Sequence, residues 1–304
     1  MMERRSSLRT SGLTDEQLPA LYRAADSASL KGQHSFLNAM RLRLGALLFA
    51  AGLGALVGNM GPPDWFAAGA VVGFIVAVGV ELYLLLARPE TAWYEGRAAA
   101  ESVKSLAWRY AVGGQPFPIG EPNVDGAFLS RLRDILTDLD QTTLDATVRD
   151  GEQISRAMQL LRDELTDDRR GAYRAGRVEE QRDWYAKKSV WNEVRARRWR
   201  LAAIVLEVAG IIAGIFTIVG WVKLDLLSFF AAATATVAAW LQTKQHETLG
   251  RAYAITSQEL ALVHSDWSAA RTEEQWAQFV DKAEEAISRE HTLWRASRGV
   301  PPTR

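Results

Sequence analysis

The sequence predicts an all-α, polytopic membrane protein with four transmembrane helices in two repeated hairpins, together with a cytoplasmic helical domain. Three observations predict this fold class. Four apolar runs have the length of a membrane span, and short connections join them in pairs. The remaining segments show helical periodicity and no convincing strand-like alternation.

The composition excludes several classes of protein. The chain has 304 residues, with 36 Lys and Arg balanced by 36 Asp and Glu. A net charge of zero argues against a strongly basic nucleic-acid-binding protein, so no nucleic-acid partner is expected. Because cysteine is absent, disulfides, thiolate zinc sites and thiol nucleophiles are impossible. Four histidines offer little for a metal site, so no metal and no cofactor is predicted.

The apolar runs cover residues 42–60, 65–87, 201–221 and 224–241. A helix of about 20 residues crosses the ~30 Å hydrocarbon layer of a bilayer, and each run is close to that length. Four buried helices of a soluble bundle are the alternative, but such helices seldom lack a polar face over five turns. The connections are short, so neighbouring spans must form antiparallel hairpins.

The distribution of basic residues predicts the orientation of the spans. The outer loops carry only Lys223. The basic residues at the other ends of the spans are Arg41, Arg43, Arg88, Arg195, Arg197, Arg198, Arg200, Lys244 and Arg251. Positively charged flanks stay in the cytoplasm, which places both termini there. Trp65 and Trp221 at outer ends, with Trp199 and Trp240 at inner ends, are expected to form aromatic belts.

The chain partly matches itself when it is shifted by 154 residues. Gly96-Arg97-Ala98 then falls on Gly250-Arg251-Ala252, and residues 65–87 fall on 219–241. This predicts two copies of one unit in the same orientation, with a gapless register across the spans. Chance similarity between two hairpins is the alternative. The expected boundaries are a disordered terminus 1–13, a first unit 14–126, a helical connector 127–165, a second unit 166–296 and a disordered terminus 297–304.

The segments outside the spans are predicted to be helical. Residues 14–17 form a capping-box pattern that opens a helix toward Met40, and residues 272–275 open the last helix in the same way. Residues 93–110 are expected to continue from the second span, and residues 167–200 to run into the third. Apolar residues recur with a helical period in the connector at Phe128, Leu129, Leu132, Ile135, Leu136, Leu139, Ile154, Met158, Leu161 and Leu165.

Several segments together resemble a known family. They are residues 22–26 (YRAAD) with Ser29, residues 99–110 (AAESVKSLAWRY) leading into 113–117 (GGQPF), and Gln181, Trp184 and Tyr185 before the third span. The chain resembles a bacterial tandem SLATT protein over roughly residues 15–295. That family comprises two-transmembrane effectors associated with nucleotide-second-messenger conflict systems. The resemblance implies a pore-forming or membrane-disrupting effector of the bacterial inner membrane, acting in antiphage defence with a nucleotide-signalling or sensor partner. It implies no catalytic residues.

Two carboxylates inside the spans are the most informative residues. Glu81 and Glu207 each lie about six residues, or roughly 9–10 Å, from the cytoplasmic end of a span. A charge in hydrocarbon costs a few kcal/mol unless it is hydrated, paired or protonated. Small residues share their helix faces, so both carboxylates are expected to face packed helices rather than lipid. Two roles are open for these carboxylates. They could line a cation-attracting vestibule, or they could have a structural role, through a hydrogen bond to a nearby backbone group or an interfacial ion pair with Arg88 or Arg200.

Other residues have weaker patterns. Asn59, Asp64 and Asp225 are candidates for the outer mouth of a pore. Close helix packing is expected at the glycines of three GxxxG patterns, which are Gly54, Gly58, Gly69, Gly73, Gly210 and Gly214. The lipid-facing basic cluster consists of Arg195, Arg197, Arg198 and Arg200. It sets the orientation, contacts anionic lipid headgroups or binds an anionic nucleotide.

Enzyme chemistry has little support, so the chain is not expected to be an enzyme. His246-Glu247 lacks the partner of an HExxH motif, and no phosphate-cradling or dinucleotide glycine motif occurs. Four spans with few polar residues enclose too little for a wide pore. We therefore expect a homo-oligomer whose pore forms between subunits and is gated through residues 88–110 and 184–215. A non-conducting membrane adaptor and a small-ion transporter are the alternatives.

Overall fold

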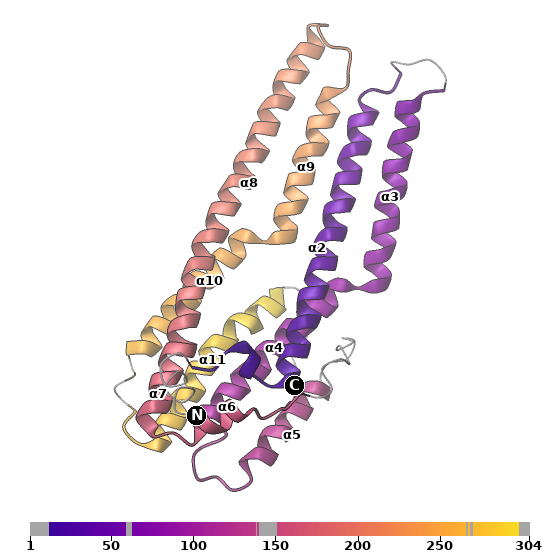
Figure 1. Ribbon diagram of the computed structural model, residues 1–304. Coiled ribbons are helices and arrows are strands. Elements are labelled where there is room, and N and C mark those ends of the chain that lie inside the picture. Colours follow the sequence, from indigo (N-terminus) through magenta and orange to yellow (C-terminus); the bar gives the residue numbers. More distant parts are fainter. Residues whose placement is uncertain are drawn as a thin grey trace. The chain divides into compact units, whose positions relative to one another are not determined.

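The computed structural model describes residues 12–58, 63–137, 139, 151–265, 267 and 270–297, and no strand occurs in these ranges (Figure 1). The predicted all-α class is confirmed. The helices are η1 (Asp15–Gln17), α2 (Ala20–Gly54), α3 (Trp65–Ala87), α4 (Pro89–Val112), α5 (Val124–Thr137), α6 (Arg156–Arg162), α7 (Thr166–Tyr173), η3 (Arg174–Glu179), α8 (Glu180–Ile218), α9 (Leu226–Lys244), α10 (His246–Ser265) and α11 (Glu273–Ser297).

The four predicted spans are confirmed as long apolar helices. They lie in α2, α3, the continuous helix of residues 166–218, and the segment of residues 226–263 that begins with α9. At most 28% of the residues in any of these apolar stretches are buried inside the chain. Exposed Leu, Ile, Val and Phe side chains on this scale require an apolar solvent, so the chain is a membrane protein.

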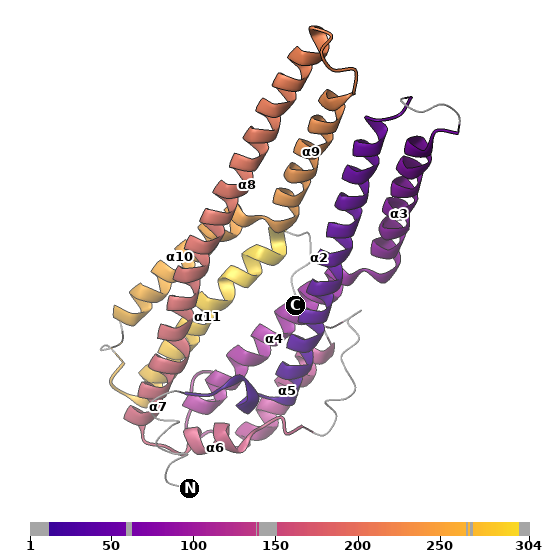
Figure 2. The same cartoon turned by 45° about the horizontal axis from the view of Figure 1, so that its top comes forward.

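The chain forms two compact units, and each takes segments from both halves of the sequence. The hairpin unit comprises residues 34–89 and 190–250, and the helical unit comprises the described parts of residues 1–33, 90–189 and 251–304. Within the hairpin unit, α2 lies beside α3 and α8 beside α9 in both views (Figures 1 and 2). Long helices α2 and α8 contribute residues to both units.

The two hairpins repeat the same local structures, but not in a gapless register. Aspartates cap α3 and α9, and these caps, Asp64 and Asp225, are 161 positions apart. Left-handed residues end the same two helices, and these, Arg88 and Gln245, are 157 positions apart. The single shift of 154 residues is therefore wrong, because the loops and helices of the two hairpins differ in length.

Residues 93–110 do not continue from the second span, contrary to the sequence expectation. Arg88 has φ 41° and ends α3, and α4 begins at Pro89. Proline disfavours the α conformation in the residue before it and has no N–H to extend a helix, so the break follows from Pro89. The third span does behave as predicted, because one helix runs from residue 166 to residue 218.

The helical unit has its own aromatic core. Trp108, Phe117, Phe128, Tyr173 and Trp276 are all at most 1% exposed. Leu13 is also buried, so the expected disordered terminus 1–13 extends too far, and its residues 1–11 lie outside the described residues.

Two details of the helix predictions need correction. The capping box at Thr14 and Gln17 forms on the short turn η1, while α2 begins only at Ala20 after Pro19. Leu165 is 76% exposed because it precedes α7 rather than lying on a buried helix face. By contrast, the predicted cap at Thr272 is present, since its hydroxyl accepts a hydrogen bond from the Gln275 N–H at 3.2 Å.

Gly73→Ala is expected to destabilise the chain by about 1–3 kcal/mol through overpacking of α3 against α2. A Cβ at Gly73 would lie 2.9 Å from the Ala46 carbonyl oxygen and 2.9 Å from the Ala50 Cβ. Gly79→Ala on the same helix is the control, because a Cβ there meets nothing within 4 Å. Denaturant titration in micelles measures both variants. Equal stabilities would contradict the close approach at Gly73.

Candidate functional site

Glu81 makes an ion pair within the membrane-spanning part of the hairpin unit. The Arg43 Nε on α2 lies 2.9 Å from the Glu81 Oε2 on α3, and the two side chains are 34% and 44% exposed. The sequence suggested Arg88 or Arg200 as partners, but Arg88 ends α3 and Arg200 pairs with Glu247. The basic partner thus lies on the preceding helix of the same hairpin.

Glu207 is exposed within its own chain, so the expected packing against another helix is not seen there. It is exposed on α8 among exposed apolar side chains, Ile204 at 54%, Val208 at 50% and Ile211 at 63%. No hydrogen bond or ion pair to Glu207 occurs within the described residues. A carboxylate on an apolar face therefore remains uncovered in the single chain.

The six glycines divide into three groups. Gly69 and Gly73 lie against α2, where added Cβ atoms would be 2.5 Å from Leu53 Cδ1 and 2.9 Å from Ala50 Cβ. Gly210 and Gly214 lie against α9, where added Cβ atoms would be 3.2 Å from Phe230 Cβ and 3.6 Å from Leu227 Cδ1. Gly54 and Gly58 have open space around them, so the expected packing is not seen there within this chain. Gly54 is the last residue of α2.

Asp64 and Asp225, expected at an outer mouth, have local structural roles. Asp64 Oδ1 accepts hydrogen bonds from the N–H groups of Phe66 and Ala67 at 2.9 and 3.1 Å, and its Oδ2 accepts one from Gly58 at 2.7 Å. Asp225 accepts one from the Ser228 N–H at 3.1 Å. Both residues cap helix N-termini, which satisfies otherwise unpaired donors. Asn59 lies outside the described residues.

Cations and indole rings gather at the ends of the spans that the sequence analysis expected to be cytoplasmic. The Trp240 ring has the Arg41 guanidinium at 5.5 Å and the Lys244 ammonium at 5.7 Å, and it contacts Trp199 edge-on at 6.4 Å. Arg195 of the basic cluster lies 5.0 Å from the Trp191 ring. Arg195, Arg197, Arg198 and Arg200 are exposed on α8.

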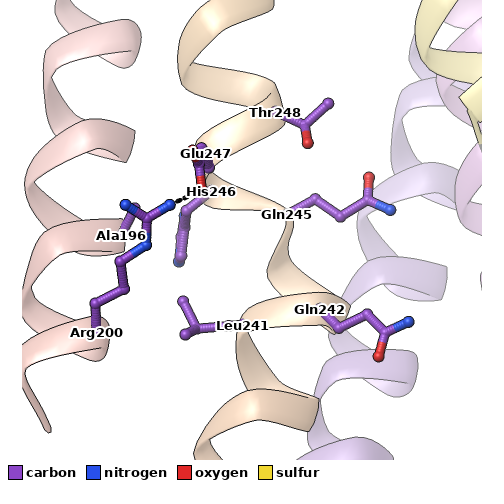
Figure 3. A pocket seen from close by; sticks show the side chains of 8 residues that line it. All are labelled: Ala196, Arg200, Leu241, Gln242, Gln245, His246, Glu247 and Thr248. Carbon is purple, nitrogen blue, oxygen red and sulfur yellow. Dashed lines mark hydrogen bonds and ion pairs between the residues drawn. The ribbon is translucent and has the colours of Figure 1, made fainter. Parts of the chain in front are cut away.

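A pocket of about 310 Å³ with a mixed polar and apolar lining lies at the junction of α9 and α10 (Figure 3). Figure 3 shows Arg200 of α8 reaching toward Glu247 of α10, with which it pairs. His246 is buried beside them, and its Nδ1 lies 2.7 Å from the Asn192 Oδ1. Burial, Lys244 and Arg195 lower the pKa of His246 to about 4, so the imidazole is neutral at pH 7. The charges of Arg200 and Glu247 balance each other, so the pocket lining combines this ion pair with the neutral His246, amide and hydroxyl groups and carries no net charge.

A fully buried charge cluster lies in the helical unit, and the sequence analysis missed it. Arg177 lies in η3, a π-helical turn between α7 and α8, and is 0% exposed. It donates to Glu284 from Nε at 3.0 Å and from Nη2 at 2.8 Å, and its Nη2 also donates to Glu101 at 2.8 Å. The Tyr173 hydroxyl donates to Glu284 at 2.9 Å.

The electrostatics of this cluster keep Arg177 charged. Burial alone would lower the pKa of Arg177, but Glu284 and Glu101 hold it well above its usual value. Burial and Glu284 raise the pKa of Tyr173 well above 10, so the phenol stays protonated. No sequence signal separates Arg177 from the many solvated charges around it. Its position in a π-helical turn is visible only in the fold.

Comparison with known families finds two related domains in tandem. A family described as SMODS and SLOG-associating 2TM effector domain 3 matches residues 19–170, and one described as SMODS and SLOG-associating 2TM effector domain 1 matches residues 173–294. Each match contains one hairpin, and the first also includes the expected connector at residues 127–165. No curated protein and no solved structure is significantly similar to the chain.

Proposed function

The chain belongs to the family of SMODS and SLOG-associating 2TM effector domains, so it is a membrane-associated effector, and we propose that it assembles as a homo-oligomer around an ion-conducting pore. The pore forms between subunits. The protein acts by conduction and not as an enzyme, in bacterial defence or conflict signalling.

The exposed carboxylate of Glu207 is the observation that carries this proposal. A charged side chain at the helix centre in lipid costs about 2.5–3.5 kcal/mol on insertion scales. Within its own chain Glu207 is exposed on α8, beside apolar side chains that suit lipid. A neighbouring copy or a water-filled lumen removes this cost. A ring of Glu207 carboxylates around a lumen would favour cations.

The basic ends of the spans support a cytoplasmic location for both termini. Lys and Arg concentrate at the ends joined to the helical unit, whereas the opposite loops carry Lys223. Positive charge favours the cytoplasmic side of the bacterial inner membrane. A nucleotide-signalling or sensor partner would then reach the helical unit, and a bound partner shifts gating only if it prefers one of two states.

Glu207→Gln is expected to lower the cation-over-anion permeability ratio by roughly tenfold, which corresponds to about 1.4 kcal/mol of electrostatic preference. The ratio follows from reversal potentials in planar bilayers, where spontaneous openings of a closed channel are also recorded. Glu193→Gln, an exposed carboxylate on the cytoplasmic part of α8, is the matched control. Inserted protein without openings would favour a membrane-anchored adaptor, and coupling of flux to a pH gradient would favour a transporter.

A further inference from the structure

The helix that enters the third span contains one irregular turn. Residues 166–218 form a continuous helix in which α7 and α8 are in line in both views (Figures 1 and 2). Between them, η3 (Arg174–Glu179) is a π-helical turn. A π-turn accommodates one extra residue and has poorer hydrogen-bond geometry than an α-helix, so it needs compensation from its surroundings.

Arg177 supplies this compensation from within the turn. Its guanidinium joins η3 to Glu284 of α11 and Glu101 of α4 through three charged hydrogen bonds of 2.8–3.0 Å. Gly176 of the same turn lies against Gly12, where a Cβ would be only 2.9 Å from the Gly176 Cα. Moving the turn to an α-helical register would pull Arg177 away from both carboxylates. The buried ions therefore lock the π-turn.

We infer that η3 is a register switch for α8, locked by Arg177 with Glu284 and Glu101, and that its conversion to α-helix turns the third span about its own axis. Each residue of an α-helix corresponds to about 100° of rotation and 1.5 Å of rise. When the extra residue of the π-turn is wound into regular helix, every residue beyond it turns by about 100°. Glu207 lies on that part and would point in a new direction.

This inference deepens the proposed function and rests on it in one respect. Rotation of Glu207 changes conductance only if α8 lines a pore. The rotation itself is measurable without any ion flux. Because α11 supplies Glu284, a partner that displaces α11 would release the lock, which gives a cytoplasmic signal a route to the span.

The test compares three forms of the full chain in lipid vesicles. The unlocking variant is Arg177→Met with Glu284→Gln, which removes the lock and leaves no charge on its two fully buried side chains. The matched control is Arg174→Met with Glu179→Gln, an exposed pair on the same turn with side chains 47% and 34% exposed. The third form adds deletion of Ala175 to the unlocking variant. Without the extra residue, the turn becomes α-helical while the residues beyond it keep their original direction.

The readout is the direction of the helix face that contacts lipid. The chain has no cysteine, so spin labels can be placed singly at each residue from 203 to 212, and oxygen accessibility reports the phase of the pattern. In the unlocking variant we expect the phase of the accessibility pattern to shift by about 100°. In the control variant the phase should not change, and after deletion of Ala175 it should return to that of the wild type. Should the unlocking variant fail to fold, Arg177→Met with both Glu101→Gln and Glu284→Gln, which leaves none of the three charges in the cluster, replaces it.

The outcomes distinguish the inference from the proposed function. A folded unlocking variant that keeps the wild-type phase overturns the switch, and so does a shift that survives the deletion of Ala175. Conductance is recorded on the same preparations. A phase shift without conductance would support the register switch and contradict the proposed pore. Conductance without a phase shift would support the pore and contradict the register switch.

Discussion

Arg177→Met is expected to lower the free energy of unfolding by about 3–5 kcal/mol, because it leaves buried carboxylates without their cation. Glu284 is 0% exposed, and its two oxygens receive both hydrogen bonds from the guanidinium. Glu101, 18% exposed, loses its ion pair with Arg177 as well. The expected loss is a large part of the total stability of a typical domain.

Denaturant titration of the full chain in detergent micelles measures this loss. Arg174→Met is the control, since the exposed pair of Arg174 with Glu179 should contribute only about 0–1 kcal/mol. Combining Arg177→Met with Glu284→Gln should recover much of the stability, because neutral partners remove the lone buried charge. Equal stabilities for Arg177→Met and Arg174→Met would mean that the buried cluster contributes nothing to folding.

The spans were predictable because lipid imposes a simple requirement on sequence. A window of 18 or more apolar residues is sufficient to identify a span, and short loops determine that neighbouring spans pair. The expectation of a continuous helix from the second span into residues 93–110 overlooked a readable signal, because Pro89 disfavours a helical conformation at Arg88. The break after α9 has no such signal. Gln245 adopts φ 49° although nothing in its residue type favours that conformation.

The directions of side chains on the spans were harder to predict. For a helix in lipid, every face is apolar, so rows of small residues indicate packing without specifying which helix is the partner. The small residues around Gly73 and Gly210 do lie against neighbouring helices. Glu207 was expected on the same face as Gly210, yet its side chain is exposed. In the helical unit, Arg177 could not be distinguished from solvated arginines, because long-range pairing with Glu284 leaves no local pattern.

Arg43→Leu is expected to destabilise the hairpin unit by about 2–3 kcal/mol, because it leaves Glu81 as a lone carboxylate in hydrocarbon. The two side chains form a direct pair with 2.9 Å between Nε and Oε2. Replacing both residues, Arg43→Leu with Glu81→Leu, should bring the stability to within about 1 kcal/mol of the parent, because no charge then remains unpaired. Unfolding in micelles measures the stabilities of both variants and of the single variant Glu81→Leu. Together with the parent, these complete a double-mutant cycle that gives the coupling energy between Arg43 and Glu81.

The coupling energy between Arg43 and Glu81 depends on whether water or hydrocarbon surrounds the spans. Side chains that are 34% and 44% exposed would be partly hydrated in water. An ion pair exposed to water contributes about 0–1 kcal/mol, and each single variant would then cost little. In hydrocarbon the same exposure offers no hydration, so Arg43→Leu must cost more than the double variant. A coupling energy below about 0.5 kcal/mol would contradict a membrane environment for this part of the hairpin.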